Sequence, residues 1–192
     1  MRTAPPPPPA APTDPGARRA RRVLLRGGPV ARAVARADLR LYRAIRSAAR
    51  PPLLEPVARF SRLGEHAALW LALGAAGMAF DERHRARWRR ALLAVAGTYA
   101  LNTAVKVVIG RARPALEDLP ALVATPTALS FPSAHASSSF AAARAYSALL
   151  PDAPLYGVAA AMALSRVYLG AHYPSDVAAG AVLGTLTGSA GR

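Results

Sequence analysis

Charged residues are segregated along this chain, and their layout constrains the fold more than any other feature of the sequence. Ala, Leu, Gly and Val dominate the runs that are nearly free of charge, which span 66–80, 91–109, 136–150, 154–170 and 177–188. The chain nevertheless carries 25 Lys and Arg against 10 Asp and Glu, a net charge of +15, with most of the Arg before residue 50 and in 83–90. Apolar runs between basic flanks are typical of helices embedded in a membrane.

The sequence also allows other classes of protein to be weighed against a membrane protein. A nucleic-acid partner is not expected, because the Arg-rich parts lack interleaved aromatic side chains. A soluble all-α core is an alternative, because every run is near or below the roughly 20 residues that a helix needs to cross a bilayer. The Ala, Gly and Ser content of the runs instead favours close packing of helices in lipid. The absence of cysteine excludes a disulfide framework and a thiolate metal site.

The sequence divides into three parts. Residues 1–27 contain five consecutive prolines and clustered Arg, which predicts a disordered arm. Residues 28–65 predict amphipathic helices at a membrane interface. Residues 66–190 predict an all-α, membrane-embedded bundle of about five spans. We therefore expect a multi-pass protein of the cell membrane.

The segment before the bundle alternates Arg with apolar residues. One helical stripe within 29–49 runs through Leu39, Leu41, Tyr42, Ile45 and Ala48. We expect this helix to lie on an anionic membrane surface and to end at Pro51-Pro52. A helix docked on the rest of the fold is the alternative.

Basic side chains cluster where the second apolar run ends, in KVVIGRARP (106–114). Lys106 and Arg113 are seven residues apart, so a continuous helix would place them roughly on one face. Gly110 and Pro114 favour an earlier end to the helix. Taken alone, a basic cluster at a membrane edge is usually a snorkelling anchor.

The stretch SFPSAHASSS (130–139) predicts the start of a helix. Pro132 suits the first helical turn, and Ser130 or Ser133 can cap it. Free backbone N–H groups at a helix N-terminus attract anions, and His135 falls in this first turn. A well-capped helix with an incidental His is the alternative.

The stretch SRVYLGAHYPSD (165–176) joins the fourth and fifth runs. A glycine and Pro174 interrupt it, and Pro174 can begin the next helix. Arg166 then lies near the end of one helix, His172 just before the next, and Asp176 in its first turn. A nearby Asp can orient a His and stabilise its imidazolium form.

An up-and-down bundle would bring these three stretches together. The end of the second span, the start of the third, the end of the fourth and the start of the fifth all fall on the same membrane face. Several cations and a helix N-terminus around two His residues indicate a phosphate site with a nucleophile and an acid.

The order and spacing of these residues resemble the signature of the type 2 phosphatidic acid phosphatase (PAP2) family. That signature reads K-x6-RP, PSxH and SR-x5-H-x3-D, and the resemblance covers about residues 66–188. The chain departs from it at Ala134, where the family usually has Gly. An Ala there is costly at a positive φ and harmless within a helix.

The resemblance implies a role for each matched residue. His172 would attack phosphorus and form a phosphohistidine, Asp176 would orient it, and His135 would protonate the leaving group. The implied phosphate-binding residues are Lys106, Arg113, Ser133, Ala134 and Arg166. The resemblance implies a lipid phosphate substrate, and it implies no metal and no cofactor.

The resemblance leaves the lipid open. The runs LSFPSAHASSSFAAA and ALSRVYLGAHYPSDVAAGAVLG are similar to those of small actinobacterial members, such as the decaprenylphosphoryl-5-phosphoribose phosphatase group of cell-wall synthesis. Undecaprenyl diphosphate, phosphatidic acid and phosphatidylglycerophosphate phosphatases share the same catalytic set. Vanadium haloperoxidases resemble the same site but are soluble and larger, and a non-enzymatic membrane scaffold would not need all three parts of the signature.

Overall fold

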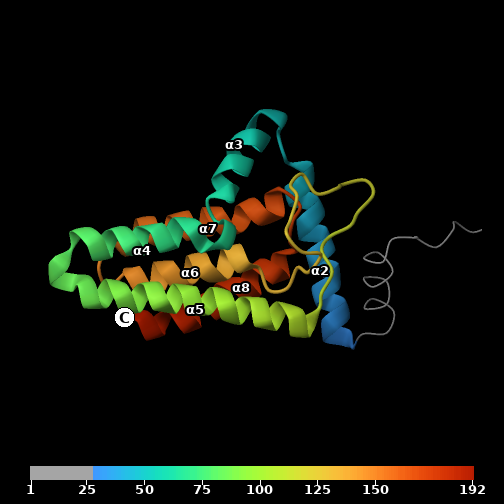
Figure 1. Cartoon of the computed structure of the whole chain (residues 1–192). Helices are drawn as coiled ribbons and strands as arrows, with labels where there is room; N and C mark the ends of the chain where they lie inside the picture. Colours follow the sequence, from blue (N-terminus) through green and yellow to red (C-terminus); the bar gives the residue numbers. More distant parts are fainter. Residues whose placement is uncertain (1–27) are drawn as a thin grey trace, which may run out of the picture.

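The computed structural model describes residues 28–192, which form an α-helical bundle (Figure 1). The predicted disordered arm, 1–27, lies outside the described residues. The α-helices are α2 (Pro29–Ser47), α3 (Pro51–Arg62), α4 (Ala68–Phe80), α5 (Arg85–Ile109), α6 (Ala134–Tyr146), α7 (Asp152–Tyr168) and α8 (Pro174–Gly188). Short 3-10 turns precede α4 and α5 and follow α8. The predicted all-α class is confirmed.

Helix α6 lies at the centre of the bundle. It contacts α4, α5, α7 and α8, which run alongside it (Figure 1). Its side chains are mostly Ala and Ser, and nearly all of them are buried. Small side chains let the surrounding helices approach closely, as the composition predicts.

Helices α6 and α8 approach each other closely along Gly180, Gly184 and Gly188. A Cβ atom at Gly180 would lie 2.6 Å from the carbonyl oxygen of Ser133, and one at Gly188 would lie 2.5 Å from that of Ala141. A glycine every fourth residue keeps one face of α8 free of side chains, so the two backbones meet directly.

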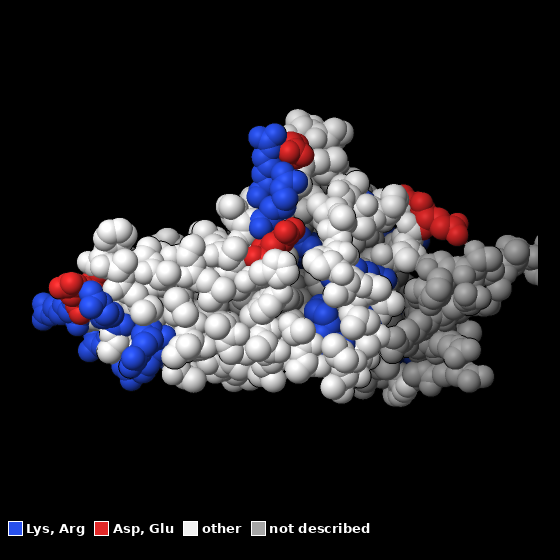
Figure 2. All heavy atoms as spheres, in the orientation of Figure 1, with Lys and Arg blue, Asp and Glu red and all other residues white. Residues whose placement is uncertain are grey.

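Many large apolar side chains lie on the outside of the bundle, and several polar side chains lie inside it. Figure 2 shows a broad uncharged surface between the Arg cluster at the α4–α5 turn and the charged residues at the other end. The exposed large apolar side chains of the bundle helices include Leu93, Leu101, Val107, Val108, Leu164, Val182 and Leu186. Water disfavours such a surface and hydrocarbon favours it.

One described helix is long and apolar enough by itself to cross a membrane. It spans Glu82–Ile109, and only 22% of its most apolar 18-residue window is buried in the protein. Pro51–Arg62 and Glu65–Phe80 meet the same criterion together, with a bend of 49° between them. The other bundle helices are shorter, with 13 residues in α6, 17 in α7 and 15 in α8.

Helix α2 crosses one end of the bundle, and its buried face is polar (Figure 1). Asp38, Tyr42 and Arg46 are buried, whereas Leu41 is 52% exposed. Of the predicted apolar stripe, Tyr42 therefore faces the bundle and Leu41 faces outward. Loop carbonyl groups at this end of the bundle accept hydrogen bonds from Arg46 (Pro120 O, 2.7 Å) and Tyr42.

The connection from α2 to α3 also differs from the prediction. Helix α2 ends at Ser47, and Pro51 and Pro52 form the first turn of α3 rather than the end of α2. Proline suits this position because the first turn of a helix does not use its own N–H groups.

Candidate active site

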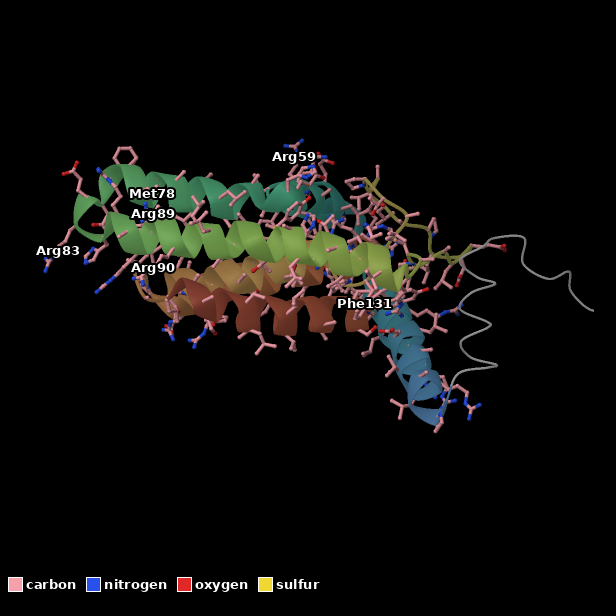
Figure 3. All side chains as sticks on the ribbon, turned by 60° about the horizontal axis from the view of Figure 1, so that its bottom comes forward. Arg59, Met78, Arg83, Arg89, Arg90 and Phe131 are labelled. Atoms are coloured by element: carbon pink, nitrogen blue, oxygen red, sulfur yellow. The ribbon has the colours of Figure 1, made fainter. Side chains whose placement is uncertain are left out.

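The three polar stretches meet at the end of the bundle that α2 crosses. The end of α5, the start of α6, the end of α7 and the start of α8 all lie there, as the predicted topology requires. In Figure 3, Phe131 marks this end, and Arg83, Arg89 and Arg90 mark the opposite one. Six of the predicted site residues are buried: Lys106, Ser133, His135, Arg166, His172 and Asp176.

His172 lies between a cation and a carboxylate. Arg113 Nη1 is 3.1 Å from His172 Nε2, and His172 Nδ1 is 3.7 Å from Asp176 Oδ2. A guanidinium can only donate, so Nε2 accepts and the ring proton is on Nδ1, facing Asp176. Burial, followed by the charges of Arg113, Arg166 and Lys106, lowers the pKa of His172 well below its ordinary value. The ring is therefore neutral at neutral pH.

Arg113 comes from a loop rather than from α5. The helix ends at Ile109, and Gly110 follows it in the left-handed conformation with φ of 59°. Lys106 and Arg113 therefore do not share a helix face. Arg113 also donates to Ala171 O and Thr127 O, both at 2.7 Å. Burial lowers the pKa of Arg113 to about 10, so it stays charged at neutral pH.

Lys106 lies one turn inside the end of α5 and points at the segment that leads into α6. Its Nζ is 3.0 Å from Pro132 O, 3.3 Å from Leu129 O and 3.4 Å from Ser130 O. These carbonyl groups hold the buried ammonium near the N-terminus of α6. The positive charge of Lys106 also contributes to lowering the pKa of His172.

Helix α6 begins at Ala134, two positions after Pro132. Ser133 is the N-cap, and its Oγ accepts from the backbone N–H of Ala136 at 3.4 Å. Pro132 therefore precedes the cap, and its predicted place in the first turn is wrong. Ala134 is the first helical residue. In residues 28–192 a positive φ outside glycine occurs only at His66 and Ala67, so Ala134 carries no such strain.

His135 and Arg166 both contact Ser61, near the end of α3. His135 Nε2 is 3.1 Å from Ser61 O, and Arg166 Nη1 donates to Ser61 Oγ at 2.6 Å. The buried Nε of Arg166 has no hydrogen-bond partner within residues 28–192. Nothing in the sequence marked Ser61, because it lies in an Arg-rich amphipathic segment outside the three stretches.

A second cation, Arg111, contacts Asp176 from the side away from His172. Arg111 Nη1 is 2.7 Å from Asp176 Oδ1, and Arg111 Nη2 is 2.7 Å from Asp38 Oδ2. The sequence indicated Arg111 only as part of a basic cluster, and it gave no reason to connect Asp38 of α2 with the site. Spacing could not reveal this contact, because it joins residues 73 positions apart.

The assembled site has the chemistry of an anion site. Lys106, Arg113 and Arg166 bring positive charge around the ring of His172, next to the start of α6. Cations and helix N-terminal N–H groups stabilise a phosphoryl group with its spread of negative charge. No group of three or more metal-ligating His, Cys, Asp or Glu side chains occurs in the part of the chain that the structure describes.

The family model for the PAP2 superfamily matches residues 87–191, more than half of the chain. This chain belongs to the PAP2 superfamily. The match includes every predicted site residue and helices α6–α8, but neither α2 nor α3. As a PAP2 protein, the chain is an enzyme of the phosphoric ester hydrolase class.

Curated relatives extend this assignment. The decaprenylphosphoryl-5-phosphoribose phosphatase of Mycolicibacterium smegmatis is 42% identical over 138 residues, which are 69% of this chain and 74% of that one. The protein of the same name from Mycobacterium tuberculosis is 41% identical over 147 residues, which are 73% of this chain and 79% of that one.

Two solved structures share the fold. The LpxE protein of Aquifex aeolicus superposes with a TM-score of 0.70 at 28% identity, covering 80% of this chain and 93% of its own. The transmembrane PAP2 type phosphatidylglycerolphosphate phosphatase of Bacillus subtilis superposes with a TM-score of 0.66 at 27% identity, covering 81% of this chain and 82% of its own.

Proposed function

We propose that this PAP2 protein is a multi-pass membrane phosphatase that hydrolyses a phosphate monoester of a polyprenyl-linked lipid and releases free phosphate. The proposed substrate is decaprenylphosphoryl-5-phosphoribose, the compound in the names of the mycobacterial relatives. This chain is more than 40% identical to those relatives across more than two thirds of its length, which supports the proposal that it acts on the same class of substrate.

The contact between Arg113 and His172 carries the proposed mechanism. It identifies Nε2 as the nitrogen with the lone pair in a neutral ring. When substrate binds, Arg113 would move its hydrogen bond from Nε2 to a phosphoryl oxygen, which frees this lone pair for attack. In the first step, Nε2 forms a bond to phosphorus while the bond from phosphorus to the sugar oxygen breaks. Asp176 balances the positive charge that develops on the ring.

His135 is the proposed acid and base. In its protonated form it gives a proton to the leaving oxygen, and the phosphate dianion of the bound substrate favours that form. In the second step, neutral His135 takes a proton from water as the water oxygen attacks the phosphohistidine. Free phosphate leaves, and both rings return to their starting states.

The remaining predicted residues are proposed to hold the phosphoryl oxygens. Arg166 is suited to this role because its buried Nε is unpaired within the described residues. Lys106, Arg113, the Ser133 hydroxyl and the Ala134 N–H complete the set. Several charge-assisted hydrogen bonds to one phosphoryl group favour the transition state, in which negative charge is spread over these oxygens.

The surface supports a membrane location with about five spans. Many large apolar side chains are exposed on helices that are packed by small residues, and Figure 2 shows a broad uncharged surface on one face of the bundle. Helix α2 suits the interface, because Val30, Val34 and Leu41 are exposed and recur at i, i+4 and i+11 on one face. The polar face of α2 that docks on the bundle lies next to this exposed apolar face. The helix can therefore dock on the bundle and lie on the membrane surface at the same time.

A glycerolipid phosphate is the second candidate substrate. The similarity to the Bacillus subtilis phosphatidylglycerolphosphate phosphatase supports it, although at lower identity than the mycobacterial relatives. Undecaprenyl diphosphate is a further alternative. A soluble haloperoxidase-like enzyme and a non-enzymatic scaffold fit less well with the exposed apolar side chains and the assembled site.

The test is a substrate panel with purified protein in detergent and no added metal. Phosphate release is measured from decaprenylphosphoryl-5-phosphoribose, undecaprenyl diphosphate, phosphatidic acid and phosphatidylglycerophosphate, each with wild type and His172→Ala. We expect the highest kcat/KM on the first substrate, inhibition by vanadate and no turnover by the variant. A higher kcat/KM on a glycerolipid would contradict the proposed substrate class.

A further inference from the structure

We propose that Asp38 of α2 is a positioning residue that acts through Arg111 to hold Asp176 as the partner of His172. This inference rests on the proposed function of the His172 site. It assigns a role in the reaction to a helix that lies outside the region matched by the PAP2 family.

Asp38 is the acidic residue of an Arg-rich helix, and it points into the protein. Its side chain is 3% exposed. Oδ1 accepts from the backbone N–H of Ser175 at 2.8 Å, and Oδ2 accepts from the Ser175 hydroxyl at 2.6 Å and from Arg111 Nη2 at 2.7 Å. A buried carboxylate with this many donors has a fixed position.

Arg111 connects this carboxylate to the site. Its Nη1 donates to Asp176 Oδ1 and to Ser175 Oγ, both at 2.7 Å, and its guanidinium lies 4.4 Å from the centre of the Tyr173 ring. A planar guanidinium held at both ends of its fork has little freedom to rotate. Arg111 therefore transmits the position of Asp38 to Asp176.

Asp176 is held by both of its oxygens. Oδ1 accepts from Arg111, and Oδ2 accepts from the backbone N–H of Tyr173 at 2.8 Å. These contacts orient the carboxylate so that Oδ2 lies 3.7 Å from His172 Nδ1. Losing Arg111 as a fixed donor would leave Oδ1 without this contact, so the carboxylate would be held less firmly in its orientation toward the ring.

Charge leads to the same conclusion. Asp38, Arg111 and Asp176 together carry one net negative charge, whereas Arg111 and Asp176 alone would carry none. The ring of His172 becomes positive when Nε2 is phosphorylated, and it then needs a nearby negative charge. Asp38 thus neutralises Arg111 and leaves the charge of Asp176 available to the ring.

The experiment compares Asp38→Asn with Asp118→Asn. Asp118 forms a second ion pair with α2, to Arg43 at 3.7 Å, but both of these side chains are more than half exposed. Hydrolysis of a prenyl phosphate by purified protein is measured at a temperature where thermal unfolding in detergent shows each variant to be folded. We expect Asp38→Asn to lower kcat roughly ten- to a hundredfold, as misplacement by about 1 Å can do, with little change in KM. Asp118→Asn should match wild type.

A double-mutant cycle tests whether the effect passes through Arg111. Arg111→Met should lower kcat at least as much as Asp38→Asn, and adding Asp38→Asn to it should cause little further loss. Asp38→Glu, which keeps the charge, should recover part of the rate. The proposal would be overturned if the losses in kcat of the two single variants added up in the double variant. It would also be overturned if Asp38→Asn had the same rate as Asp118→Asn. Turnover by His172→Ala would instead contradict the proposed function.

Discussion

Arg113 donates from Nη1 to Nε2 of His172 across 3.1 Å. This contact sets the tautomer of the ring, because the nitrogen that accepts from a guanidinium cannot carry the proton itself. The proton lies on Nδ1, 3.7 Å from Asp176, and the lone pair lies on Nε2 beside a cation. A nucleophile and a binding site for its phosphoryl target are therefore adjacent.

His172→Ala should abolish phosphate release, lowering kcat by at least roughly 10⁴-fold, because the variant has no atom that can form the bond to phosphorus. His84→Ala is the matched control. His84 pairs with Asp81 in the α4–α5 turn at the opposite end of the bundle, so its loss should leave the rate unchanged. Thermal unfolding in detergent would check that both variants fold. Substantial turnover by His172→Ala would exclude the phosphohistidine mechanism.

The activity should persist on the acid side of the ordinary histidine range. The pKa of His172 is lowered by burial and by the cations around it, so the ring becomes protonated only at a pH below the ordinary value of about 6.5. Protonation removes the lone pair, so kcat/KM should fall as pH falls through the lowered pKa. A pH profile of kcat/KM checks this. An acid limb at or above pH 6.5 would be incompatible with the lowered pKa.

Ala134→Gly, which restores the residue usual in the family, should change kcat/KM by less than about twofold. Ala134 is the first helical residue of α6 and has no positive φ for glycine to relieve. The substitution should lower the free energy of unfolding by at most about 1 kcal/mol, the helix-propensity difference between Ala and Gly. Steady-state kinetics and thermal unfolding test both expectations. A large rise in kcat would mean that the Cβ of Ala134 obstructs the phosphate.

Gly184→Ala should destabilise the protein by about 1–3 kcal/mol, because its Cβ would clash with the carbonyl oxygen of Ser137 and push α8 away from α6. The matched control is Gly157→Ala on α7, where a Cβ meets no atom within 4 Å. That change should be neutral or stabilising, since Ala is the better helix former. Thermal unfolding in the same detergent compares the two. Equal stability of the two variants would argue against the tight α6–α8 contact.

The bundle helices could be predicted because the sequence signals that form and end them lie within the helices or next to them. Ala-, Gly- and Leu-rich runs, Gly110 after α5, Ser133 before α6 and Pro174 at the start of α8 all act within a few residues. Helix α2 was harder to interpret. Its apolar stripe is visible in the sequence. Its buried face, however, depends on hydrogen bonds and ion pairs with carbonyl and charged groups of distant segments.

The sequence by itself determined the family, the all-helical class and the residues that meet at the site, since an up-and-down order of spans places alternate helix ends together. Only the tertiary structure decided how those residues pair. The contacts of His172 with Arg113, of Arg166 with Ser61 and of Arg111 with Asp38 join positions 59, 105 and 73 residues apart. Such pairs depend on the rotation of each helix about its axis and on the path of the loops, which packing sets and local sequence does not.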